Sequence, residues 1–72
     1  MEKTIFTEAH KELVANLIKA RRACDLKQAD VAKKLGRTQS YISKIEAGQR
    51  RLDIVQLSEL AAIYKKRIRD FI

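Results

Sequence analysis

The 72-residue sequence contains no proline and a single cysteine, Cys24. One cysteine cannot form a disulfide within the chain, and no cluster of cysteine and histidine residues has the spacing of a metal site. No apolar run is long enough to span a bilayer, and no signal-peptide pattern opens the chain. We therefore expect a cytoplasmic protein that does not engage membranes and needs no metal or other cofactor.

Negative charge is also scarce, because 9 acidic residues stand against 16 Lys and Arg residues, for a net charge of +7. This surplus on a small surface favours a polyanionic partner, nucleic acid first and an anionic membrane surface second. Net charge alone does not exclude the simpler explanation that the lysines and arginines keep the protein soluble.

Apolar residues make up 46% of the sequence, and they recur at helical spacing. Together with the absence of proline, this predicts an ordered, all-α globule. The length allows one small domain, near the lower limit for a self-sufficient core. We expect an N-terminal arm over residues 1–7, whose Ile5 and Phe6 fold back onto the domain, and a helical domain over residues 8–72.

Residues 27–50 contain two short helical patterns separated by one glycine. The apolar positions are Val31, Ala32 and Leu35 in the first pattern and Ile42 and Ile45 in the second. Gly36 can end the first helix in the left-handed conformation, and the Thr38 hydroxyl can cap the next helix. So tight a turn favours two short helices at a steep angle, the helix-turn-helix unit.

Five helices are expected in all, and the helix-turn-helix supplies the second (28–35) and the third (39–47). The first runs from residue 8 to about residue 24, with Thr7 as its N-cap. The fourth follows Asp53, and its inward face carries Ile54, Leu57, Leu60, Ala61 and Tyr64. It either continues for another turn or ends with Lys65 at a positive φ. A short fifth helix carries Ile68, Phe71 and Ile72.

The chain resembles the Xre/Cro-type helix-turn-helix family, DNA-binding domains typified by small phage repressors, over roughly residues 9–72. The matching residues are Gln28, Val31, Ala32, Leu35, Gly36, Thr38, Gln39, Ser40, Ile42, Ile45, Glu46 and Gly48. As a set they agree in register, which makes the motif specific. The resemblance implies a compact, five-helix, phage-repressor-like domain. The departures are Asp25 and Lys65, each in place of a helix-ending glycine, and Lys27 in place of a Ser or Thr cap, whose loss costs roughly 1 kcal/mol.

The exposed side of the third helix carries polar groups suited to base edges in the major groove. Gln39 can bond adenine in a bidentate manner, Lys44 favours guanine, and Thr38 offers a hydroxyl and a methyl to thymine. The resemblance implies that Thr38, Gln39, Ser40 and Lys44 contact bases. Ser43 is the weakest member of this face, and exposure to water alone would explain it. An ordinary solvent face is nearly as good an explanation for any single residue, but the set favours base readout.

Other residues are expected to follow the phosphate backbone. The resemblance implies that Gln28 binds a phosphate, helped by the N-terminal dipole of its helix. The phosphate track is extended by Lys27, Arg37, Tyr41, Gln49 and Arg50. For Tyr41, packing of the ring beside Ile45 is an equally good interpretation.

Arg21 and Glu46 match positions that pair in the family, which implies an ion pair between the first helix and the end of the third. Loss of one partner would cost roughly 3–5 kcal/mol in a shielded pair and under about 1 kcal/mol in an exposed one. His10 is expected at the surface and Cys24 in the core. No residues have the spacing of a catalytic site, so nothing indicates an enzyme.

These features support three hypotheses. The first is a sequence-specific, repressor-like regulator that binds an inverted repeat in double-stranded DNA as a homodimer. Val55, Ile63 and the Phe71-Ile72 end would then form the contact between copies, unless they tuck inward. The second is an antitoxin or restriction–modification controller-type protein that binds a protein partner. The third, non-specific binding of RNA or membranes by charge alone, leaves the helix-turn-helix register unexplained.

Overall fold

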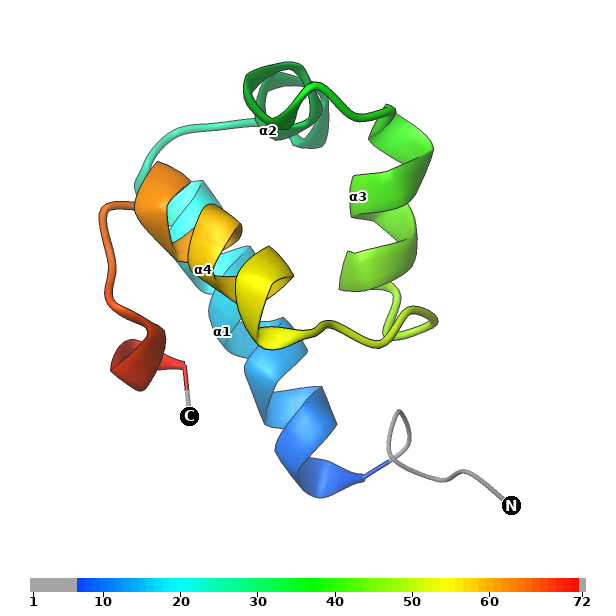
Figure 1. Ribbon diagram of the computed structural model, residues 1–72, viewed down its shortest axis with the longest axis vertical. Coiled ribbons are helices and arrows are strands. Elements are labelled where there is room, and N and C mark those ends of the chain that lie inside the picture. Colours follow the sequence, from blue (N-terminus) through cyan, green and yellow to red (C-terminus); the bar gives the residue numbers. More distant parts are fainter. Residues whose placement is uncertain (1–6, 72) are drawn as a thin grey trace.

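The computed structural model describes residues 7–71, so the expected packing of Ile5 and Phe6, and the position of Ile72, lie outside the described residues. Within that range the chain forms four α-helices and no strand (Figure 1). These helices are α1 (Glu8–Ala23), α2 (Gln28–Leu35), α3 (Gln39–Glu46) and α4 (Ile54–Ile63). The all-α prediction is therefore confirmed for the described part of the chain.

The predicted fifth helix is wrong. Ile68–Asp70 form a single 3₁₀ turn, η2, in which the Asp70 carboxylate accepts a hydrogen bond from the Arg67 N–H at 2.8 Å. This one turn lies against α4 and brings Phe71 back into the core, where its side chain is buried. A single turn is therefore enough to bury Phe71, and a longer helix is not required.

Side chains close in sequence determine where the helices begin. The Thr7 hydroxyl accepts a hydrogen bond from the His10 N–H at 3.1 Å, and Asp53 accepts one from the Gln56 N–H at 2.8 Å. At α2, Lys27 provides no side-chain cap. The Asp30 carboxylate instead accepts a hydrogen bond from the Lys27 N–H at 2.8 Å. This bond is one half of a capping box, and it offsets part of the stability lost with the missing Ser or Thr cap.

All four α-helices of the described residues are followed by a left-handed residue. Gly36 (φ 69°) ends α2 and Gly48 (φ 75°) follows α3, whereas Asp25 and Lys65, both at φ 58°, follow α1 and α4. Of the two alternatives for the end of α4, the structure therefore has Lys65 at a positive φ. A lysine in this conformation is strained, because its Cβ approaches the carbonyl oxygen.

The core is contributed by all four α-helices and by Phe71. Its residues are Leu17, Ala20, Val31, Ala32, Ile42, Ile45, Leu57, Leu60, Ala61, Tyr64 and Phe71. α3 lies against α2 and α1, and α2 also contacts α4 (Figure 1). The inner face of α3 is thus packed against two other helices, which orients its outer face.

Three core assignments from the sequence need correction. Ile54 is 60% exposed, because it is the first residue of α4 and projects beyond the core. His10, expected at the surface, is only 7% exposed, and its Nε2 has no hydrogen-bond partner among the described residues. Cys24 is half-buried, and its thiol donates a hydrogen bond to the Tyr64 carbonyl oxygen at 3.4 Å.

Candidate nucleic-acid interface

The helix α3 has one buried and one exposed side. Ile42 and Ile45 are buried in the core. The four residues predicted to contact bases are all exposed: Thr38, Gln39, Ser40 and Lys44. Thr38 also caps the helix, since its hydroxyl accepts a hydrogen bond from the Tyr41 N–H at 3.2 Å. The hydroxyl keeps its own proton to donate outward.

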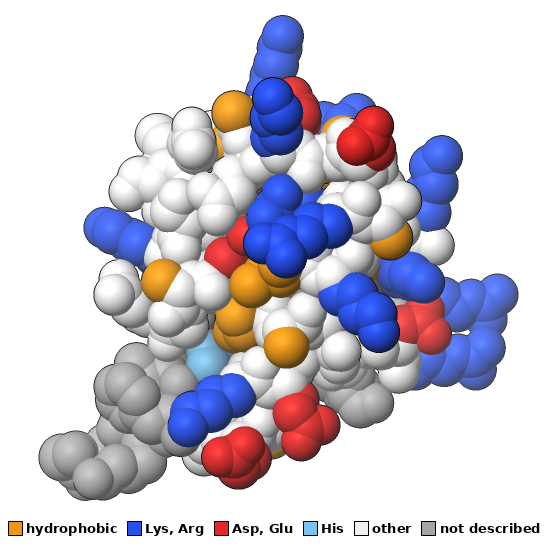
Figure 2. Space-filling model, turned by 180° about the vertical axis from the view of Figure 1, so that it is seen from behind, with side chains coloured by type: hydrophobic (Ala, Val, Ile, Leu, Met, Phe, Trp, Pro, Cys, Tyr) orange, Lys and Arg blue, Asp and Glu red, His pale blue; other side chains and the backbone are white. Residues whose placement is uncertain are grey.

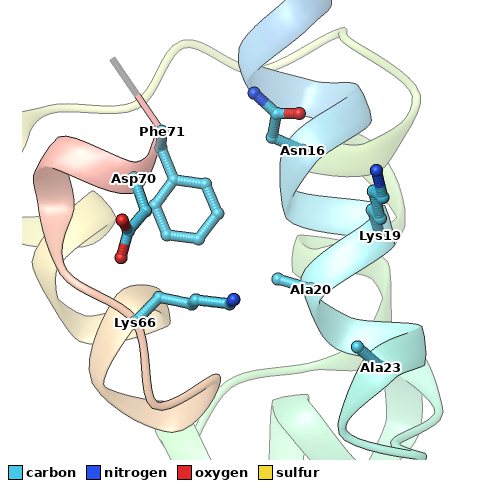
Figure 3. Close-up of a pocket in the computed structure, with 7 residues that line it drawn as sticks. All are labelled: Asn16, Lys19, Ala20, Ala23, Lys66, Asp70 and Phe71. Atoms are coloured by element: carbon cyan, nitrogen blue, oxygen red, sulfur yellow. The ribbon is translucent and has the colours of Figure 1, made fainter.

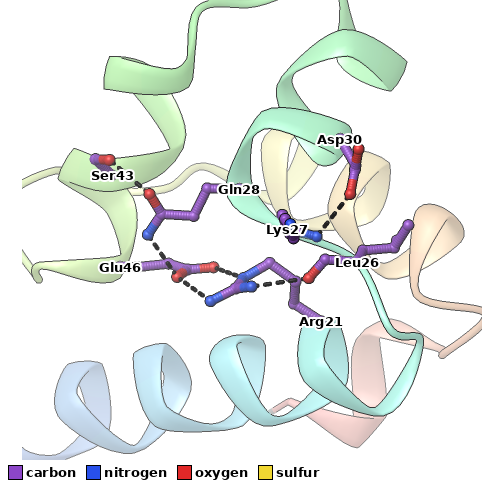
Figure 4. A network of polar contacts seen from close by, with 7 residues as sticks. All are labelled: Arg21, Leu26, Lys27, Gln28, Asp30, Ser43 and Glu46. Atoms are coloured by element: carbon purple, nitrogen blue, oxygen red, sulfur yellow. Dashed lines mark hydrogen bonds and ion pairs between the residues drawn. The ribbon is translucent and has the colours of Figure 1, made fainter.

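An ion pair joins α1 to the end of α3 (Figure 4). The Arg21 guanidinium donates hydrogen bonds from Nε and Nη2 to the Glu46 carboxylate, at 2.7 and 3.0 Å, and from Nη1 to the Leu26 carbonyl oxygen at 2.8 Å. The two side chains are 11% and 7% exposed. The hydrogen bond with Glu46 raises the pKa of Arg21 above its usual range, so the guanidinium keeps its charge. The Arg21–Glu46 pair is therefore shielded from water, the case in which loss of one partner would cost roughly 3–5 kcal/mol.

The same carboxylate extends into a hydrogen-bonded network that the sequence did not reveal (Figure 4). Gln28 Nε2 donates to Glu46 Oε1 at 2.9 Å, and Gln28 Oε1 accepts from the Ser43 hydroxyl at 2.7 Å. The view that Ser43 only faces water is therefore wrong. The one available signal was the i,i+3 spacing of Ser43 and Glu46, which places both on one side of α3.

Gln28 is half-buried, and both ends of its amide are engaged within the protein. A primary amide has two N–H donors, of which Glu46 takes one. The second N–H and the backbone N–H at the start of α2 remain the donors that a phosphate would use.

The ring of Tyr41 contacts two arginines that come from opposite ends of α3. The Cζ atom of Arg37 is 4.9 Å from the centroid of the Tyr41 ring, and that of Arg50 is 4.7 Å away. The ring is half-buried and packs against the core, as one interpretation expected. Lys27 and Gln49 are exposed in the segments that precede α2 and follow α3.

Positive charge is spread more widely than this surface. Figure 2 shows Lys and Arg side chains projecting around the outline of the face opposite to that of Figure 1. Net charge therefore does not locate a nucleic-acid interface, and the candidate interface is defined by the exposed side of α3 and its neighbouring turns.

A separate pocket of about 340 Å³ lies between α1 and the C-terminal turn (Figure 3). Its walls are formed by Asn16, Lys19, Ala20, Ala23, Lys66, Asp70 and Phe71, none of which is among the predicted site residues.

Within residues 7–71 no three His, Cys, Asp or Glu side chains are grouped so that they could hold a metal ion. No helix in that range is long and apolar enough to cross a membrane.

Comparison with known proteins agrees with this geometry. A family model described as Helix-turn-helix matches residues 17–71, which include the C-terminal part of α1 and all of α2, α3 and α4. Neither the curated proteins nor the solved structures contain a match. Since the matched segment covers most of the sequence, the chain belongs to the Xre-type helix-turn-helix family of DNA-binding transcription regulators.

Proposed function

We propose that this protein is a sequence-specific repressor that binds an inverted repeat in double-stranded DNA as a homodimer. The observation that carries the proposal is the exposed polar side of α3, held on a helix whose other side is buried in the core. An α-helix fits the major groove of B-DNA, where each base pair presents a distinct set of donors and acceptors. The network of Arg21, Glu46, Gln28 and Ser43 supports a rigid α3.

In this proposal the residues divide between base edges and backbone. Thr38, Gln39, Ser40 and Lys44 contact bases, and Gln28 contacts a phosphate at the start of α2. The remaining backbone contacts come from Lys27, Arg37, Gln49 and Arg50, and Tyr41 contributes through the two arginines that its ring contacts. Backbone contacts set the register of the protein on the duplex, and base contacts provide the sequence preference.

A homodimer is proposed because one recognition helix reads only a few base pairs. Two half-sites about 34–36 Å apart would give a two-fold dimer equivalent contacts on each. Ile54 and Val55, 60% and 62% exposed at the start of α4, support a protein contact there. Ile63 is half-buried, and Phe71 is buried and so is left out of the contact.

Selection of binding sites from a random duplex library tests this function most directly. We expect an enriched inverted repeat, bound with an affinity that falls steeply as salt rises. Gln39→Ala and Lys44→Ala should each lower affinity about 5- to 150-fold and relax the preference at one position per half-site. Lys19→Ala, which removes an equal charge from the exposed side of α1, should leave the preference unchanged. Selection that enriches no sequence would rule the proposal out.

The alternative is an antitoxin or restriction–modification controller-type protein, for which Ile54 and Val55 would contact a different protein. Light scattering on the purified chain separates the two. A dimer that becomes monomeric in Val55→Asp, with weaker binding to the full repeat, supports the homodimer. A wild-type monomer that forms a stoichiometric complex with a second protein favours the alternative.

A further inference from the structure

The Tyr41 ring brings together two cations from separate segments. Arg37 lies in the turn before α3, and Arg50 lies in the loop after it. Arg50 returns to the ring because Gly48, at φ 75°, reverses the chain: the Gly48 N–H bonds the Ile45 carbonyl oxygen and the Gln49 N–H bonds that of Lys44, both at 3.0 Å. These two hydrogen bonds form a Schellman motif.

In the described part of the chain, the two guanidinium groups have no carboxylate to neutralise them. Within residues 7–71 neither Arg37 nor Arg50 forms a salt bridge. Like charges near one another repel, and the chain already has a net charge of +7. The face of an aromatic ring attracts a cation within about 6 Å, so the ring offsets part of this repulsion. An anion bound by these guanidinium groups would offset the rest.

We propose that Tyr41 is a positioning residue that holds Arg37 and Arg50 as one two-guanidinium site for the phosphate backbone of DNA. Guanidinium groups suit this partner because their planar N–H donors bind phosphate oxygens in pairs. The ring acts through the arginines, and its hydroxyl is not required. The inference deepens the proposed function and depends on it.

The ring and the hydroxyl are separated by two substitutions at Tyr41. Tyr41→Phe keeps the ring, so we expect affinity for the selected duplex within about twofold of wild type. Tyr41→Leu removes the ring, and the loss of two exposed cation–π contacts should lower affinity about 5- to 30-fold. It should also lower the slope of log K against log salt by about 1 to 2, although no charge has been removed. A general structural defect would not produce that change in slope.

The effect should vanish when the arginines are absent. In an Arg37→Ala/Arg50→Ala background, Tyr41→Leu should change affinity by less than about twofold, because the residues act as one unit. Circular dichroism tests whether each variant is folded. If Tyr41→Leu is not folded, Tyr41→Met replaces it.

Several outcomes would overturn the inference. One is a Tyr41→Phe variant as weak as Tyr41→Leu, which would assign the contact to the hydroxyl. The others are an unchanged salt slope in the ring-less variant and an undiminished effect in the double-arginine background. Failure of the proposed function is distinguishable, since the wild-type protein itself would then enrich no duplex sequence.

Discussion

The Ser43 hydroxyl donates a 2.7 Å hydrogen bond to Gln28 Oε1, and this bond links the outer part of α3 to the first residue of α2. The Gln28 amide in turn bonds Glu46, which is paired with Arg21 of α1. Three helices therefore share one polar network beside the proposed DNA-binding surface. Movement of α3 relative to α2 would break hydrogen bonds between half-buried groups.

Ser43→Ala should lower the free energy of unfolding by about 1 kcal/mol, because Gln28 Oε1 loses its donor. Ser40→Ala is a matched control on the same helix, since it makes the same chemical change at an exposed hydroxyl. Its effect should stay within about 0.5 kcal/mol. Urea denaturation followed by circular dichroism measures both, and equal effects would argue against a contribution from the Ser43–Gln28 bond.

Glu46→Ala should lower the free energy of unfolding by roughly 3–5 kcal/mol, because it leaves the shielded Arg21 charge unpaired. The contrasting pair is Lys11 and Glu8, 3.8 Å apart, with side chains 65% and 85% exposed. Lys11→Ala should cost under about 1 kcal/mol. The same denaturation experiment compares the two, and a Glu46→Ala loss as small as that of Lys11→Ala would contradict the prediction.

Thr38 has two proposed roles that substitution can separate. Thr38→Ala removes the cap on the Tyr41 N–H and should lower the free energy of unfolding by about 1 kcal/mol. Thr38→Ser keeps a capping hydroxyl, so stability should hold while any preference for thymine that depends on the methyl group weakens. Denaturation and site selection on both variants provide the test. An unaltered base preference in the Thr38→Ser variant would rule out a contact between the Thr38 methyl group and thymine.

Lys65→Gly should raise the free energy of unfolding by about 1 kcal/mol, because glycine adopts the left-handed conformation without the cost of a Cβ atom. Lys66→Gly removes the same charge at a position without a positive φ, so it should not stabilise the protein. Thermal and urea denaturation measure the difference. A Lys65→Gly variant no more stable than Lys66→Gly would mean that Lys65 is not strained.

Alkaline pH should destabilise the fold through Tyr64. Burial, and next the charge of Glu46, raise the pKa of Tyr64 from 10.0 to about 12. Above pH 10 the unfolded chain releases this proton while the folded chain keeps it. The stability that is fully present below pH 10 therefore falls as pH rises to about 12, by up to about 3 kcal/mol.

Tyr64→Phe isolates this effect, because the lysines that titrate in the same range are common to both proteins. The stability difference between wild type and Tyr64→Phe should shift steadily in favour of the variant from pH 10 to pH 12. Urea denaturation across that range measures it. Parallel stability curves would show that the folded protein does not hold the Tyr64 proton.

Features encoded within a few residues were predictable from the sequence. Gly36 and Thr38 mark the end of α2 and the start of α3 through local backbone and capping preferences, and Asp53 does the same for α4. The apolar spacing of Ile42 and Ile45 identified the buried side of α3, and with it the exposed side on which the candidate base contacts lie.

Features that depend on distant segments were not predictable in this way. His10 appeared to be a surface residue because nothing near it in sequence shows what covers it, and Ile54 matched the apolar spacing of α4 although the core ends before it. The fifth helix reduced to one turn because burying Phe71 required no more.

The amino-acid sequence by itself thus determined the four α-helices, the N-caps of α1, α3 and α4 and the family to which the chain belongs, because helical periodicity and capping act over one or two turns. Only the tertiary structure decided that Gln28 and Ser43 join the Arg21–Glu46 pair in one network, and that Arg37 and Arg50 both contact Tyr41. Those contacts depend on the angles at which the helices pack and on where the loops reverse, which no local pattern specifies.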